Sequence, residues 1–109
     1  MRHTAYYTYI LRCSDGSLYT GITTDPARRF AEHAGGKSKS GAKYTAARHP
    51  VAYECAFLSA DRAAASRLEV RIKRLSRAQK LRLIAGEDFP ALEPESYRRV
   101  PISPEGKTE

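Results

Sequence analysis

The sequence has few cysteines and no long apolar run, and each shortage excludes a class of protein. Its two cysteines, Cys13 and Cys55, lie far apart without CxxC spacing, so we expect free, packed thiols rather than a disulfide or a zinc site. No apolar run approaches the roughly 20 residues that span a bilayer, and the first residues do not resemble a signal peptide. The sequence therefore predicts a cytoplasmic protein without a membrane span.

Acidic residues are also scarce, with 12 Asp and Glu against 19 Lys and Arg in 109 residues, a net charge of +7. From residue 87 onward six acids face three basic side chains, so residues 1–86 carry sixteen basic side chains against six acids, or +10. Such a charge favours a polyanionic partner, because each neutralised phosphate releases counterions. We therefore predict a basic domain over 1–86, large enough for a single core, and a proline-rich acidic tail over 87–109.

The first part of the chain has the pattern of a β-hairpin. Residues 6–12 and 18–23 are rich in aromatic and β-branched side chains, and an Asp-Gly turn lies between them. Period-two alternation places Tyr9 on one face of the first strand and Tyr19 with Gly21 on one face of the second. A glycine inside a strand marks a bulge or a place where another group approaches the backbone closely, which makes Gly21 a candidate for such an approach.

A helix is predicted to follow the hairpin. Asp25 and Pro26 are a cap residue and a first helical residue, and Gly35-Gly36 ends the pattern. Within this helix Arg29 and His33 are spaced i, i+4 and lie on one face.

The rest of the chain predicts one further strand and two further helices. Residues 51–58 alternate, with Val51, Tyr53, Cys55 and Phe57 on one face. Asp61 caps a helix that runs to about residue 75, and a second helix spans about 76–85 and presents Leu81. Four prolines after residue 86 rule out regular structure there. The order β-β-α-β-α-α predicts an α+β fold, a three-stranded antiparallel sheet flanked by helices.

The basic loop 35–43 and the residues after it allow two interpretations. A loop with Lys37, Lys39 and Lys43 and no large apolar group is either solvated or closes on phosphates. Tyr44, next in sequence, is either a surface residue or part of the same cleft. If a nucleic acid binds, we expect these four residues, with Lys73, to contact it.

Glu69 is the one acid among eight basic residues between 62 and 86. At 100° per residue it lies at the edge of the apolar stripe of its helix. It is either an i, i+4 partner of Lys73 or a ligand for Mg²⁺, whose other oxygens would come from substrate phosphate and water. Phosphodiester hydrolysis needs such a metal, a base for water and cationic groups around the phosphate.

Together these residues resemble a known family. Tyr7-Thr8-Tyr9, then Tyr19-Thr20-Gly21 after a hairpin, then Arg29 with His33, and Glu69 in a later helix are similar to the GIY-YIG nuclease superfamily, and most to its small, stand-alone bacterial members. The resemblance covers about residues 5–85. Tyr7 and Thr20 depart from the glycine and isoleucine of the two motifs, and Gln79 stands near where some members carry asparagine.

The resemblance implies a function and a set of site residues. It implies Mg²⁺- or Mn²⁺-dependent cleavage of DNA with one ion on Glu69, and catalytic roles for Tyr9, Tyr19, Arg29 and His33. One tyrosine would act with water as the general base, and the arginine would stabilise the phosphate. We expect an endonuclease, a monomer, that acts in DNA repair or processing.

Two other functions stay open. One is a weakly catalytic or non-catalytic nucleic-acid-binding module that acts with a partner enzyme. The other is a regulatory interaction protein without a nucleic-acid role, which the charge of residues 1–86 argues against. An isolated acid in a cationic helix favours the enzyme over the pure binding module.

Overall fold

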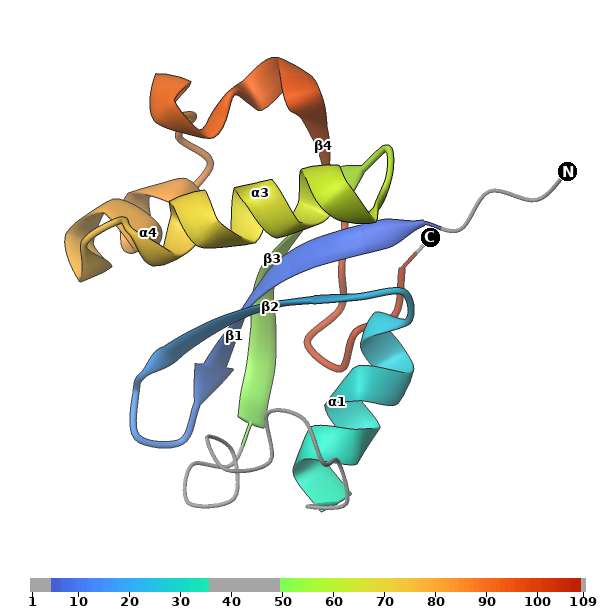
Figure 1. Ribbon diagram of the computed structural model, residues 1–109. Coiled ribbons are helices and arrows are strands. Elements are labelled where there is room, and N and C mark those ends of the chain that lie inside the picture. The colour runs from blue at the N-terminus through green and yellow to red at the C-terminus, as the bar shows by residue number, and fades with distance from the viewer. Residues whose placement is uncertain (1–4, 36–49, 109) are drawn as a thin grey trace, which may run out of the picture.

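A computed structural model of the chain describes residues 5–35 and 50–108. Its four strands are β1 (Tyr6–Cys13), β2 (Leu18–Thr23), β3 (Pro50–Ser59) and β4 (Tyr97–Val100). Its helices are α1 (Pro26–Gly35), α3 (Arg62–Lys73) and α4 (Arg77–Ile84), with two short 3₁₀ helices, η1 (Pro90–Leu92) and η2 (Pro94–Ser96). The strands form one antiparallel sheet in the order β2-β1-β3-β4 (Figure 1).

The prediction of an α+β fold with an antiparallel sheet is confirmed, but the predicted number of three strands is wrong. The tail contributes the fourth strand, which pairs with the end of β3 between Ala56 and Ser59. Its prolines are compatible with this structure because they lie outside the strand. Pro90 and Pro94 begin 3₁₀ helices, where a missing N–H costs little, and Pro101 follows the last strand residue.

Two hydrophobic clusters lie on opposite faces of the sheet. Ile10, Cys55 and Phe57 pack with the apolar side chains of α3 and α4. On the other face Tyr9 packs in a second cluster with Phe30 of α1. Figure 1 shows α3 and α1 on either side of the hairpin strands. Because β1 is flanked by strands on both edges and by helices on both faces, its side chains are the most enclosed in the described chain.

A β-bulge in β3 changes which side chains meet the hairpin. Ile10 pairs with Cys55 but Leu11 pairs with Tyr53, so Glu54 is an extra residue in the ladder. The strict alternation predicted for this strand was therefore wrong. Cys55 lies on the α3 face, whereas Tyr53 lies on the face of Tyr9.

The last residues of the tail pack beneath α1. Tyr53 donates its backbone N–H to the Pro104 carbonyl at 2.9 Å and its hydroxyl to the Pro26 carbonyl at 2.8 Å. Gly106 is buried there with φ of +98°, and a Cβ on it would lie 2.6 Å from the Pro26 oxygen. The tail thus contacts the first turn of the helix that carries Arg29.

Other predictions from the sequence have clear outcomes. Both cysteines are free and buried, as expected, and burial raises the pKa of Cys55 to about 12. In the part of the chain that the structure describes, no helix has the length and apolar character needed to cross a bilayer. Leu81, expected to be presented to the core, is 47% exposed, and Leu83 is the buried residue of α4.

Candidate active site

Tyr9 and Arg29 form the centre of the candidate site. Tyr9 is fully buried on β1, and the Arg29 side chain, which α1 brings over the same sheet face, is 17% exposed. The guanidinium of Arg29 lies close enough to the Tyr9 hydroxyl for each group to shift the pKa of the other. The pairing of a strand tyrosine with the helix arginine that the sequence selected is therefore present in the structure.

The environment of Tyr9 favours its neutral phenol. Burial raises the pKa of Tyr9 above its ordinary value, and the nearby Tyr19 phenol raises it further. The Arg29 hydrogen bond and charge oppose this rise, and the Glu69 carboxylate adds to it. Tyr9 therefore keeps its proton at neutral pH.

Gly21 is the position where the ring of Tyr9 meets the backbone of β2. The two residues pair directly across the hairpin, and a Cβ on Gly21 would lie 2.6 Å from the Tyr9 hydroxyl and 3.2 Å from the Tyr19 ring. The close approach expected at this glycine is thus made by a side chain of the protein itself. Glycine is required because any other residue would displace the phenol that binds Arg29.

Aromatic rings surround Tyr9 on the same face. The centroid of the Tyr19 ring is 6.3 Å from that of Tyr9, and the Tyr53 ring lies edge-on at 5.0 Å. Tyr19 is half-buried, so its phenol is nearer the surface than that of Tyr9. Tyr53 was missed by reasoning from the sequence, because only the bulge at Glu54 turns it toward this face.

Arg29 is held by a second contact. Its Nη1 lies 3.3 Å from Oε1 of Glu32, one turn further along α1. Burial alone would lower the pKa of Arg29, but the Tyr9 hydrogen bond and the Glu32 carboxylate raise it above its ordinary value. The guanidinium is therefore a fixed, permanent positive charge at the edge of the site.

His33 lies behind Tyr19 and not at the surface. It is 1% exposed, and its ring is edge-on to that of Tyr19 with centroids 5.8 Å apart. Burial lowers the pKa of His33, and the Arg29 charge lowers it further. A neutral, enclosed imidazole in contact with Tyr19 suits a positioning residue better than one that exchanges protons with solvent.

Glu69 lies on α3, which packs on the opposite face of the sheet near the β2 edge. Its side chain is 22% exposed, and its Oε2 lies 3.3 Å from Nζ of Lys73. The i, i+4 pair that the sequence allowed is therefore present. Glu69 is nevertheless close enough to Tyr9 for its charge to raise the pKa of that phenol. The two halves of the predicted site lie within electrostatic reach of each other.

The donor set fits a metal ion only in part. Among the described residues, no group of three His, Cys, Asp or Glu side chains is placed to hold an ion. Glu69 supplies one carboxylate, and Mg²⁺ commonly binds to one or two carboxylates with water and substrate phosphate as its other ligands. The residues therefore fit an ion that arrives with a phosphate, and not a site formed by the protein alone.

The remaining predicted residues have different outcomes. Lys37, Lys39, Lys43 and Tyr44 lie outside the described residues, so their proposed contacts stay predictions. Lys73 is described and pairs with Glu69. Gln79, the counterpart of the asparagine of some family members, belongs to the capping box of α4, where its side chain accepts from the Ser76 backbone N–H at 2.9 Å.

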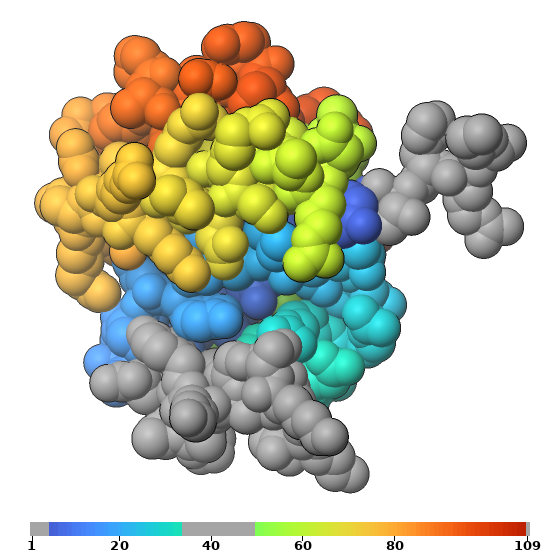
Figure 2. Space-filling model, viewed as in Figure 1, coloured from blue at the N-terminus to red at the C-terminus, as the bar shows by residue number. Residues whose placement is uncertain are grey.

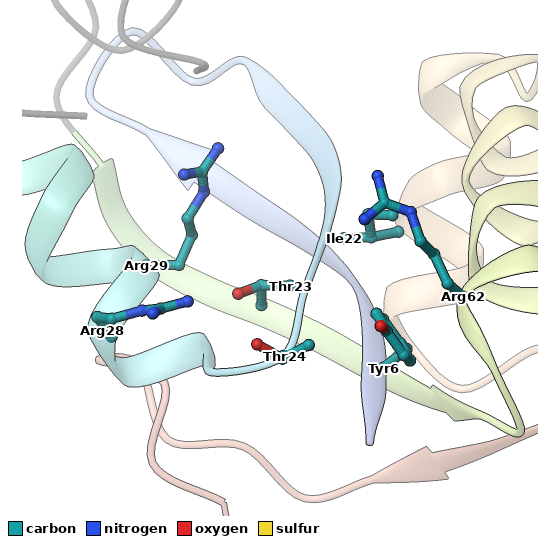
Figure 3. A pocket seen from close by; sticks show the side chains of 7 residues that line it. All are labelled: Tyr6, Ile22, Thr23, Thr24, Arg28, Arg29 and Arg62. Atoms are coloured by element: carbon teal, nitrogen blue, oxygen red, sulfur yellow. The ribbon is translucent and has the colours of Figure 1, made fainter. Parts of the chain in front are cut away.

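A hollow of about 240 Å³ lies beside Arg29, between α1 and the start of α3. Figure 2 shows this side of the molecule, where β2 lies between α3 and α1 and a small part of β1 is visible between β2 and α1. In Figure 3 the arginines of α1 stand on one side and Arg62 on the other, with two threonines between them. The lining residues are Tyr6, Ile22, Thr23, Thr24, Arg28, Arg29 and Arg62.

The fold and the site define a class of protein: a small α+β domain with paired tyrosines and a helix arginine on one face of an antiparallel sheet. Residues 5–82 match the model of the GIY-YIG catalytic domain. The chain belongs to the GIY-YIG family, whose members are generally endonucleases that use divalent metals.

Its relatives include several small proteins named UPF0213. One from Cupriavidus necator is 48% identical over 90 residues, which cover 83% of this chain and 92% of that protein. One from the archaeon Halobacterium salinarum is 49% identical over 75 residues, 69% of this chain and 94% of that protein. The solution NMR structure of a UPF0213 protein from Bacillus halodurans is 40% identical with a TM-score of 0.48, and the match covers 84% of this chain and 95% of that one.

Proposed function

We propose that this protein is an endonuclease that hydrolyses phosphodiester bonds in DNA with one divalent cation, Mg²⁺ or Mn²⁺, bound by Glu69. The observation that carries the proposal is the convergence of the buried Tyr9 phenol, the Arg29 guanidinium and the Tyr19 ring, with the Glu69 charge within reach of Tyr9.

The protein's own groups have distinct roles in the proposed reaction. Water gives up a proton as its oxygen bonds to the phosphorus atom, the bond to the leaving oxygen breaks, and that oxygen takes up a proton from solvent. Arg29, fixed by Tyr9 and Glu32, neutralises the negative charge that develops on the phosphate oxygens. A cation on Glu69 would supply Lewis-acid stabilisation of the same charge.

In this proposal the two phenols orient the attacking water. Tyr9 keeps its proton at neutral pH, so it orients water as a hydrogen-bond partner and takes a proton only if a bound cationic group lowers its pKa. Tyr19 is half-buried and reaches nearer to solvent, and His33 holds its ring from behind. We assign Tyr9 and Tyr19 to the water, and His33 to positioning.

The alternative is a nucleic-acid-binding module that cuts little and acts with a partner enzyme. The Glu69–Lys73 ion pair favours it, because this pair gives the acid a structural role without a metal. Action in DNA repair or processing, a cytoplasmic location and a monomeric state stay predictions under either function.

The test is nicking of supercoiled and branched DNA in Mg²⁺ or Mn²⁺ by the parent protein and by Glu69→Gln. We expect the parent to nick, and the variant to lose about 100-fold or more of the rate, since a metal contributes several kcal/mol of transition-state stabilisation. Loss of an exposed i, i+4 pair costs only a few tenths of a kcal/mol, so the variant should keep its melting temperature.

Glu93→Gln is the matched control. Glu93 also pairs with a cationic side chain of α3, Arg71, at 3.3 Å, but it lies outside the site. This variant should nick at the rate of the parent. If Glu69→Gln cuts as well as the parent, the metal assignment is wrong. If both proteins bind DNA and neither cuts, the binding module is the correct function.

A further inference from the structure

The hollow between α1 and α3 collects three arginines, of which two share the single carboxylate of Glu32. Three of its seven lining residues are arginines, and among the described residues no acidic side chain lines it. Within the same described part of the chain, Arg62 has no ion pair, and the partner of Arg28 is a loosely placed Glu32 at 3.9 Å. Like charges gathered around a small space repel one another unless an anion enters it.

Hydroxyl groups at the floor of the hollow complement these cations. Thr23, at the end of β2, accepts the Asp25 backbone N–H on its Oγ1 at 3.1 Å, which leaves its own O–H free to donate into the hollow. Thr24 is exposed beside it. Guanidinium and hydroxyl donors around one space are the groups that bind phosphate oxygens.

The hollow is continuous with the candidate active site through one residue. Arg29 lines the hollow, and its guanidinium also lies close enough to the Tyr9 hydroxyl to lower the pKa of that phenol. Arg62 comes from the opposite wall, at the first residue of α3 (Figure 3). A phosphate in the hollow would therefore lie next to the phosphate that Arg29 contacts, along a line from the tyrosines toward Arg62.

We propose that this hollow is a second phosphate subsite, which binds a backbone phosphate of the nucleic-acid strand adjacent to the one that is cut, with Arg62 and Arg28 as its cationic contacts. The subsite rests on the proposed function for its substrate, but it concerns binding and not the cleavage step. It sets the direction in which the strand crosses the protein, because Arg29 binds one phosphate and Arg62 the next along the same strand.

The experiment measures DNA binding in EDTA, so that cleavage plays no part. Each of a series of oligonucleotides carries one methylphosphonate, a neutral replacement for a single phosphate. We expect two neighbouring replacements to weaken binding to the parent protein, one through Arg29 and one through Arg62. In Arg62→Gln, binding of the unmodified strand should fall about tenfold, the effect of one charge-assisted contact. In this variant the replacement that acts through Arg62 should no longer weaken binding, whereas the replacement that acts through Arg29 should still do so.

Arg77→Gln is the matched control. Arg77 is likewise an exposed arginine at the first residue of a helix, α4, but it does not line the hollow. In this variant both methylphosphonate effects should persist. The subsite is refuted if the penalties in Arg62→Gln equal those of the parent at every position. It is also refuted if inorganic phosphate displaces the bound strand at the same concentration as an unlabelled oligonucleotide does. The hollow would then bind a free anion and not a phosphate of the strand.

This binding measurement, together with the nicking assay in Mg²⁺ or Mn²⁺, separates this inference from the proposed function. If the parent never nicks DNA but one methylphosphonate effect disappears in Arg62→Gln, the subsite is supported and the nuclease function is not. If the parent nicks DNA but the methylphosphonate effects on binding are identical in Arg62→Gln and Arg77→Gln, the nuclease function is supported and the subsite is not.

Discussion

At the scale of single residues, the site depends on one glycine that faces one phenol. Strand alternation was enough to predict that Tyr9, Tyr19 and Gly21 share a face, and the ring contacts confirm it. The sequence could not show that the group approaching Gly21 is Tyr9 itself, since direct pairing across the hairpin depends on the turn register. Tyr53 was missed for a similar reason, because a bulge is not visible as a change in composition.

Replacing Gly21 with alanine should destabilise the protein through this contact. The added methyl would lie 2.6 Å from the Tyr9 hydroxyl and 2.9 Å from Cζ of the ring, so the ring must move. We expect a loss of about 1–3 kcal/mol in the free energy of unfolding, the usual cost of an extra group in a packed core. Denaturant unfolding measures it.

Tyr9→Phe supplies the second half of a double-mutant cycle. The phenylalanine ring lacks the oxygen nearest to the new methyl, so Gly21→Ala should cost less in the Tyr9→Phe background than in the parent. Strictly additive losses would show that the two groups do not meet in the folded protein.

At the scale of elements, the local signals were sufficient for the hairpin and for the helices. The Asp-Gly turn and the Asp61 cap both lie where the sequence placed them. The tail was predicted wrongly because β4 has no strong pattern of its own. Its residues become a strand through pairing with β3 and through Arg99, which lies over the Phe57 ring at 4.8 Å and donates to the Leu83 carbonyl at 2.9 Å.

The end of the tail should be a stabilising element whose sensitive position is Gly106. In Gly106→Ala the new Cβ meets the Pro26 carbonyl at 2.6 Å and adopts a φ of +98°, so both packing and backbone oppose it. We expect a loss of about 2–5 kcal/mol, the sum of the left-handed backbone cost and the overpacking cost. Thermal or denaturant unfolding measures it.

Gly86→Ala is the control for the backbone contribution. Gly86 has a φ of +115°, but no atom lies within 4 Å of the place that an alanine methyl would occupy, so only the backbone cost of about 1–2 kcal/mol should appear. Equal losses in the two variants would show that the tail does not pack against α1.

At the scale of the whole molecule, the net charge indicated the kind of partner but not which residues would gather to bind it. The net charge of +7 is a property of the composition alone, and the sequence predicted a polyanion from it. Which arginines gather around one hollow depends on how the start of α3 and the first turn of α1 meet across β2. Residues so distant in sequence come together only through the fold.

DNA binding should therefore depend strongly on salt and weakly on sequence. If the site and the hollow together neutralise about three phosphates, raising the salt fourfold should weaken binding about 40-fold. Two duplexes of equal length and different sequence should show the same slope of log affinity against log salt, because phosphate contacts carry no sequence information. Fluorescence anisotropy at several salt concentrations measures both. Salt-independent binding would contradict the electrostatic origin of the affinity.

The pairing of β4 with β3 has a consequence for aggregation. The GIY-YIG match ends at residue 82, yet the strand that covers one edge of the sheet begins at Tyr97. A chain cut after the matched domain would leave the backbone groups of Ala56–Ser59 bare beside apolar side chains. Such an edge is a template for strand addition between molecules. Because the short tail strand occupies this edge, it protects the domain from aggregation.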